Sequence, residues 1–173
     1  MADAPDAPDN DSRGPVFVFS GQGSQWNAMG AILLDTDEAF SKVIETIEPL
    51  IQKVSGFSVT ETLRQADKLV SIDLIQPAIF AMQVALAESL RAKGVVPSAI
   101  IGHSMGEVSA AVVAGALSLE DGVQVICHRA TLCRAIEQPG AMAVVELSPA
   151  AVRDELGHRR IADVAIAVVA ASS

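Results

Sequence analysis

A serine between two glycines, placed where an apolar run meets a run of small residues, constrains the fold of this chain more than any other feature. The motif GHSMG (residues 102–106) follows the apolar segment 95–101 and precedes the small-residue segment 107–116. A strand that bends sharply into a helix needs glycines beside the serine, because Cβ atoms there would clash, and the bend projects the serine hydroxyl. The next amide, Met105 N–H, can then bind an oxyanion. We therefore predict that Ser104 is a nucleophile at the start of a buried helix.

A second glycine-rich segment, GQGSQW (residues 21–26), follows an apolar run at residues 15–19 that is typical of a strand buried on both faces. No Lys-Ser or Lys-Thr pair follows these glycines, which excludes a Walker phosphate-binding loop. A glycine-rich turn at the carboxyl end of a parallel strand can supply a second oxyanion N–H. An ordinary turn is the alternative for this segment taken alone.

Capping signals and apolar periodicity predict a series of helices. Asp35 with Glu38 resembles a capping box, and Pro77 suits the first turn of a later helix. The expected helices cover residues 35–56, a short stretch from 58, and residues 77–93, 107–116, 118–137 and 148–157.

The pattern changes after residue 140. Residues 141–147 and 162–170 have the apolar content of strands on either side of the last helix, as in the first half of a small α+β subdomain. A chain that ends on an apolar strand leaves an unpaired edge, so we expect the chain to be incomplete. The expected organisation is a flexible tail or linker at residues 1–14, a core at 15–140 and a truncated subdomain at 141–173.

Composition excludes several classes of function. The net charge is −9 and aromatic residues make up 3% of the chain, which argues against nucleic-acid binding. The acidic, proline-rich start, residues 1–10, is the opposite of a signal peptide, and no apolar run reaches transmembrane length. Cys127 and Cys133 lack the spacing of metal ligands, so no metal is expected. Two free thiols fit a reducing cytosol, and we predict a cytoplasmic protein.

Three segments in order, residues 20–26, 75–81 and 102–107, closely resemble the acyltransferase domains of type I polyketide synthases. Those domains are relatives of the malonyl-CoA:acyl-carrier-protein transacylases of fatty acid synthesis, and the tryptophan of GQGSQW is typical of the polyketide synthase branch. The resemblance covers residues 15–173, the N-terminal portion of such a domain. It implies an α/β fold with a mostly parallel sheet flanked by helices, followed by the start of a ferredoxin-like subdomain.

The resemblance also implies the roles of four residues. Ser104 corresponds to the nucleophile that accepts the acyl group from coenzyme A. Gln22 and Met105 correspond to the positions whose backbone amides form the oxyanion hole. Arg129 corresponds to the arginine that holds the free carboxylate of the extender unit, and a bidentate guanidinium suits a carboxylate better than lysine does.

The implied reaction is ping-pong transfer of a malonyl-type extender unit from coenzyme A, through acyl-Ser104, to the phosphopantetheine of an acyl carrier protein. No bound cofactor is implied, and neighbouring polyketide synthase domains are further partners. Methylmalonyl is favoured over malonyl, because residues 75–80 resemble such domains in actinobacterial lipid synthases. Met105 is neither the glutamine nor the branched aliphatic residue often found after the serine. The basic cluster at residues 153–160 is a candidate carrier-protein docking patch or a solvated helix end.

A general base for Ser104 is missing from the pattern. The family's catalytic histidine lies beyond residue 173, and His103, His128 and His158 are each expected to be structural. Without a base, acid–base help worth roughly 10²–10⁴-fold is lost, so this chain alone is expected to be weakly active or inactive. Two alternatives stay open. A serine esterase or patatin-like hydrolase would share the Ser104 turn, and a non-catalytic fragment would explain the missing histidine.

Overall fold

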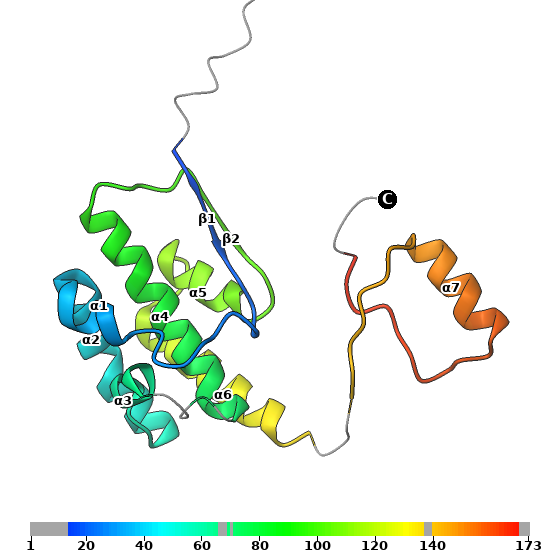
Figure 1. The fold of residues 1–173 in the computed structure, drawn as a ribbon, viewed down its shortest axis with the longest axis horizontal. Helices are drawn as coiled ribbons and strands as arrows, with labels where there is room; N and C mark the ends of the chain where they lie inside the picture. Colours follow the sequence, from blue (N-terminus) through cyan, green and yellow to red (C-terminus); the bar gives the residue numbers. More distant parts are fainter. Residues whose placement is uncertain (1–13, 66–68, 70, 137–139, 170–173) are drawn as a thin grey trace, which may run out of the picture. The chain divides into compact units, whose positions relative to one another are not determined.

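The computed structural model describes residues 14–65, 69, 71–136 and 140–169, so the tail or linker predicted at residues 1–14 lies, apart from Gly14, outside the described residues. The contacts divide the chain into two units, residues 1–137 and 138–173. Figure 1 shows the elements in chain order: β1 (Val16–Phe19), α1 (Ala31–Thr36), α2 (Glu38–Ser55), α3 (Val59–Arg64), α4 (Ile72–Ala92), β2 (Ala99–Gly102), α5 (Gly106–Val113), α6 (Leu119–Arg134) and α7 (Pro149–His158).

Strands β1 and β2 lie side by side and run parallel, with Phe17 opposite Ile100 and Phe19 opposite Gly102. The chain crosses between them through helices α1 to α4, as parallel pairing requires. Helix α5 packs against both strands. The predicted α/β class, a parallel sheet flanked by helices, is confirmed.

The prediction that β1 is buried on both faces is wrong for the described residues. Side chains alternate along a strand, and Phe17 and Phe19 pack against the core. Val16 and Val18 point the other way, and the side chain of Val18 is 68% exposed. Ile101 of β2 is exposed as well, so the described part of the sheet is covered on one face.

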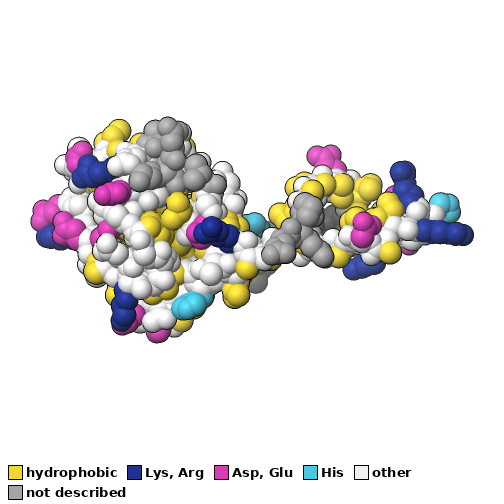
Figure 2. All heavy atoms as spheres, turned by 90° about the horizontal axis from the view of Figure 1, so that it is seen from below, with side chains coloured by type: hydrophobic (Ala, Val, Ile, Leu, Met, Phe, Trp, Pro, Cys, Tyr) yellow, Lys and Arg dark blue, Asp and Glu magenta, His cyan; other side chains and the backbone are white. Residues whose placement is uncertain are grey.

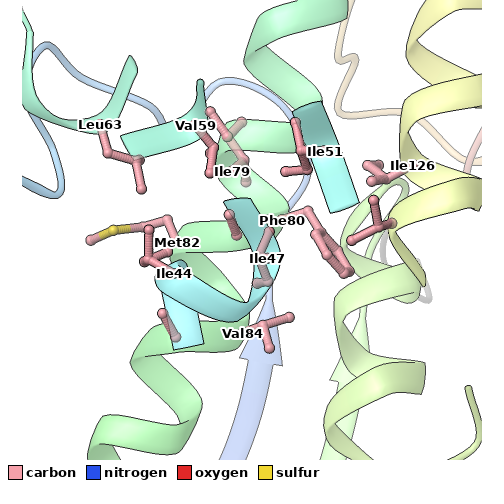
Figure 3. Close-up of a cluster of buried hydrophobic side chains, with 14 of the residues drawn as sticks. Ile44, Ile47, Ile51, Val59, Leu63, Ile79, Phe80, Met82, Val84 and Ile126 are labelled. Carbon is pink, nitrogen blue, oxygen red and sulfur yellow. The ribbon is translucent and has the colours of Figure 1, made fainter. Parts of the chain in front are cut away.

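The hydrophobic core lies between α2, α4 and α6. Figure 3 shows Ile44, Ile47 and Ile51 of α2 beside Phe80 of α4 and Ile126 of α6. The buried positions of α2 recur every three or four residues, which is the spacing of one helix face. Helix α4 is buried along most of its length, so it is the element around which the others are placed.

Three of the predicted helix starts are confirmed by their caps. The hydroxyl oxygens of Ser58, Ser118 and Ser148 each accept a hydrogen bond from a backbone N–H three residues further on, at 3.1, 3.0 and 3.2 Å. These bonds satisfy amides that have no partner inside the helix. Helix α6 ends at Arg134, and the end predicted for it near Glu137 lies outside the described residues.

Two predicted helix starts are wrong. Asp35 lies inside α1, and Asp37 caps α2 instead. Helix α4 begins at Ile72, five residues before Pro77, because the Ser71 carbonyl already accepts hydrogen bonds that start the helix. Pro77 therefore lies inside α4, where it has no N–H for the carbonyl four residues before it. Its burial among apolar side chains offsets that loss.

Asp37 joins the start of α2 to the end of α4. Its Oδ1 accepts from Phe40 N–H at 2.9 Å, and its Oδ2 accepts from Ser89 Oγ at 2.6 Å and from Lys93 Nζ. Lys93 above all, then Ser89 and Phe40, hold the pKa of this carboxyl well below its usual range. A carboxyl whose pKa is lower in the folded than in the unfolded state stabilises the fold above its unfolded pKa. That contribution is lost as the pH falls through the folded pKa.

We expect Asp37→Asn to lower the urea midpoint of unfolding at neutral pH, because the charged partner of Lys93 is gone. We also expect the variant to lose less stability than the wild type as the pH falls below about 4, where the unfolded carboxyl starts to bind its proton. Urea titrations over this pH range measure both effects. Glu45→Gln, on the exposed side of α2, is the matched control. Parallel pH curves for Asp37→Asn and the wild type would contradict the assignment.

The second unit contains α7, and the described residues on both sides of it form no helix or strand. The strands predicted at residues 141–147 and 162–169 are not formed, and residue 170 lies outside the described residues. A strand needs a hydrogen-bonded neighbour, and neither segment has one within residues 140–169. Their apolar side chains are therefore exposed, Val144 at 98%, and Figure 2 shows hydrophobic side chains on the surface of this unit.

No helix in the described ranges is both long enough and apolar enough to cross a membrane.

Candidate active site

Ser104 lies at a sharp turn between β2 and α5, as the glycine spacing predicts. Its φ is +56°, a left-handed backbone conformation that is rare for a residue with a side chain. The turn is held by His103 N–H, which donates to Phe19 O of β1 at 2.9 Å, and by Gly106 N–H, which donates to His103 O at 3.0 Å. Strained backbone of this kind persists only where the surroundings impose it, and it is common at functional residues.

The glycines on both sides of Ser104 allow two close backbone approaches. A Cβ atom on Gly102 would lie 2.4 Å from Glu107 Cα, and one on Gly106 would lie 2.2 Å from Phe19 O. In each position the obstacle is backbone, which cannot move aside as a flexible side chain can. The residue types at 102 and 106 are therefore set by sterics, and they place α5 directly against the end of β1.

We expect Gly106→Ala to lower the free energy of unfolding by about 1–3 kcal/mol or more, as overpacking does. The added methyl group has to push β1 and α5 apart, because it meets Phe19 O. Chemical denaturation followed by circular dichroism measures the change. Gly157→Ala is the control, since nothing lies within 4 Å of a Cβ atom there. Equal midpoints for Gly106→Ala and the wild type would contradict this packing.

The GQGSQW loop lies against the Ser104 turn. A Cβ atom on Gly21 would be 3.2 Å from Ser104 Cβ and 3.4 Å from His103 Nδ1. Gln22, one of the two residues predicted to supply an oxyanion amide, follows directly. The other, Met105, is 1% exposed, and its buried side chain fixes the first peptide of α5. Among the described residues, neither amide donates to another backbone or side-chain group.

Arg129 of α6 is connected to the GQGSQW loop through one side chain of α4. Arg129 Nη1 donates to Gln76 Oε1 at 2.6 Å, and Gln76 Nε2 donates to Gln22 Oε1 at 3.4 Å. Gln22 and Arg129, which lie more than a hundred residues apart in sequence, therefore belong to one polar network. Sequence reasoning assigned no role to Gln76, although a polar residue within the apolar run at 75–82 was a usable signal.

A second glutamine of α4 joins Ser20, the residue before the GQGSQW loop, to the helix that follows Ser104. Gln83 Nε2 donates to Ser20 O at 2.9 Å, and Gln83 Oε1 accepts from Ser109 Oγ of α5 at 2.7 Å. Ser109 is fully buried, so the donor end of its hydrogen bond to Gln83 lies in the core. Sequence reasoning missed Gln83 too, because nothing in the local pattern shows what it contacts.

Ser104 Oγ has no hydrogen-bond partner among the residues that the structure describes. His103 is exposed next to it, and its backbone, not its ring, makes the contact with β1. His128 Nδ1 lies 2.7 Å from Gln124 O of its own helix, and His158 is the last residue of α7. Within the described residues of the first unit, neither His103 nor His128 makes a hydrogen bond to Ser104 Oγ.

The geometry favours one chemistry over others. Ser104 is exposed, and Gly21 of the GQGSQW loop lies against it. A nucleophilic hydroxyl needs such access, and it also needs N–H groups nearby that can bind an oxyanion. A guanidinium held by a neutral amide is suited to binding an anionic group. Burial raises the pKa of the Cys127 thiol, which disfavours the reactive thiolate. In the described part of the chain, no group of three or more His, Cys, Asp or Glu residues could hold a metal ion.

Comparisons with known proteins agree with this geometry. A sequence model of the family described as acyl transferase domain matches residues 16–173. The chain is 59% identical over 161 residues to a mycocerosic acid synthase-like polyketide synthase of Mycolicibacterium smegmatis, covering 93% of this chain and 8% of that protein. The chain thus spans less than a tenth of this curated relative.

Solved structures are similar as well. The acyltransferase domain of the polyketide synthase PpsC of Mycobacterium tuberculosis has a TM-score of 0.78 at 42% identity, over 84% of this chain and 44% of that one. The malonyl-CoA:ACP transacylase of Synechocystis sp. PCC 6803 has a TM-score of 0.60 at 32% identity, over 69% of this chain and 39% of that one.

Proposed function

This chain belongs to the acyl transferase domain family, and we propose that it moves a malonyl-type acyl group from coenzyme A to the phosphopantetheine thiol of an acyl carrier protein. The observation that carries the proposal is the position of Ser104, in a strained turn against the Gln22 loop, with that loop linked to Arg129. One structural neighbour is a malonyl-CoA:ACP transacylase, which supports the same class of substrate and acceptor.

The proposed reaction has two matched steps. Ser104 Oγ attacks the thioester carbon, the carbonyl oxygen takes the negative charge, and the amides of Gln22 and Met105 bind it. The C–S bond then breaks, the acyl group stays on Ser104, and coenzyme A leaves as the thiol after taking up the serine proton. In the second step the carrier thiol attacks the ester carbon of acyl-Ser104 and forms a C–S bond. The C–O bond to Ser104 breaks, and the serine oxygen takes up the thiol proton. Arg129 pairs with the free carboxylate of the acyl group throughout.

We propose methylmalonyl rather than malonyl as the preferred acyl group, on the resemblance of residues 75–80 to such domains. The organisation that we propose is a catalytic core at residues 15–140, followed by the start of a ferredoxin-like subdomain at 141–173. A carrier protein, acidic in this class, would dock on Arg153 within α7 and on Arg159 and Arg160 just after it. Basic side chains lie on the surface of this unit (Figure 2). Arg159 also pairs with Glu155 there.

We expect acylation of this chain alone to be slow. The proton of Ser104 Oγ has no acceptor among the described residues, and a positioned base is worth roughly 10²–10⁴-fold in rate. A single-turnover measurement is therefore the suitable test. The chain is incubated with methylmalonyl-CoA, its intact mass is followed over time, and the adduct is located by peptide mapping.

The expected result is one slowly formed methylmalonyl adduct on Ser104 that is discharged by added holo acyl carrier protein. Release of free methylmalonic acid without transfer would favour a serine hydrolase instead. An adduct on another residue, or none with any acyl-CoA, would overturn the proposal.

A further inference from the structure

Gln76 is a buried polar residue whose two side-chain groups are both used. Its side chain is 2% exposed, in the part of α4 that packs against α6. The Oε1 atom accepts from Arg129 Nη1, and the Nε2 group donates to Gln22 Oε1. A buried amide that loses its partners is costly, so these two contacts fix which end of the amide faces Arg129. The guanidinium is thereby held at a defined place on α6.

The hydrogen-bond partner of Arg129 is neutral, whereas two other arginines of the helices pair with carboxylates. Arg134, on the same helix, pairs with Asp73, and Arg91 pairs with Glu88. Arg129 forms no ion pair with any carboxylate in the described ranges, and its side-chain hydrogen bond goes to a neutral amide. An amide oxygen occupies one of the five N–H groups of a guanidinium and cancels none of its charge.

We propose that Gln76 is a positioning residue that sets the preference for carboxylated acyl groups. This inference rests on the proposed function. By holding Arg129 with a neutral acceptor, Gln76 orients the guanidinium and leaves its full positive charge for the carboxylate of the substrate. A glutamate of the same size at this position would pair with Arg129, neutralise it and repel that carboxylate. Through Gln22, the same amide ties the carboxylate clamp to the loop of the oxyanion hole.

The test uses two substrates that differ by the carboxylate alone, methylmalonyl-CoA and propionyl-CoA. For each, the single-turnover rate of acyl-Ser104 formation is measured on the wild-type chain and on Gln76→Glu. The readout is the rate with methylmalonyl-CoA divided by the rate with propionyl-CoA, because a merely structural defect would slow both reactions together. We expect the ratio to fall by about tenfold or more in Gln76→Glu, as for a lost charge-assisted interaction.

Two further variants complete the experiment. Gln124→Glu adds the same charge to the exposed side of α6 and should leave the ratio unchanged. Gln76→Met removes the acceptor without adding charge, so it keeps the test available if Gln76→Glu does not fold, as judged by circular dichroism. Its ratio should fall severalfold.

The outcomes separate this inference from the proposed function. A wild-type ratio retained by folded Gln76→Glu and Gln76→Met would overturn the role of Gln76 and leave acyl transfer standing. Equal wild-type rates for both substrates would do the same, since there would be no preference to set. No adduct from either acyl-CoA would overturn both.

Discussion

Ser104→Ala is expected to abolish the acyl adduct, a loss of roughly 10³-fold or more in the rate of acylation, because no other nucleophile replaces the missing hydroxyl. Intact-mass measurement after incubation with methylmalonyl-CoA gives the rate. The positive φ of Ser104 suggests a second informative substitution, Ser104→Gly. Ser104→Gly also removes the hydroxyl, and glycine adopts a φ of +56° without the strain that alanine meets.

The two variants should therefore be equally inactive and differ in stability. Relief of left-handed backbone strain is worth about 1 kcal/mol, so Ser104→Gly should unfold at a higher urea concentration than Ser104→Ala. An adduct that persists in either variant would show that another residue is the nucleophile. A less stable Ser104→Gly would show that the turn is not strained in solution.

Arg129→Met is expected to slow acylation by methylmalonyl-CoA by about 10²-fold, since a charge-assisted bidentate contact is removed. Acylation by propionyl-CoA, which lacks the carboxylate, should change little. The methionine keeps much of the side-chain volume and leaves the Gln76 amide without its donor. Single-turnover rates with both substrates measure the effect.

Arg134→Met is the matched control, because it removes the same charge from the same helix. Arg134 is exposed and pairs with Asp73, and it makes no side-chain hydrogen bond to Gln76 or Gln22 among the described residues. Its substrate preference should equal that of the wild type. If Arg129→Met slowed both acyl-CoA substrates equally, Arg129 would be a structural residue, and the carboxylate would need another partner.

Sequence reasoning succeeded where one short segment determines the structure. The turn at Ser104 follows from the two glycines beside it, since only glycine fits against Glu107 and Phe19 O. The caps at Ser118 and Ser148 follow from a hydroxyl three residues before a free amide. In these cases the physical cause lies within a few residues of its effect.

It failed where the cause lies far away in the chain. The spacing of Asp35 and Glu38 predicts Asp35 as the cap of α2, but Asp37 takes that place. Asp37 also contacts Ser89 and Lys93, more than fifty residues later, which no local pattern shows. Residues 141–147 have the composition of a strand, but strand formation depends on a neighbour that no local pattern shows. Gln76 could be noticed as a polar residue in an apolar run, but its partner Arg129 could not.

Helix α4 has a consequence for the design of chimeric synthases. Gln76 and Gln83 are seven residues apart, close to two full turns, so they lie on the same side of the helix about 10 Å apart. The Gln76 amide contacts Arg129, and the Gln83 amide contacts Ser20 O and Ser109 Oγ of α5. A graft that exchanges only the Ser104 segment or only α6 would replace the partners of Gln76 or Gln83 while α4 stays the same. Exchanges that carry residues 72–92 along with both should retain activity more often.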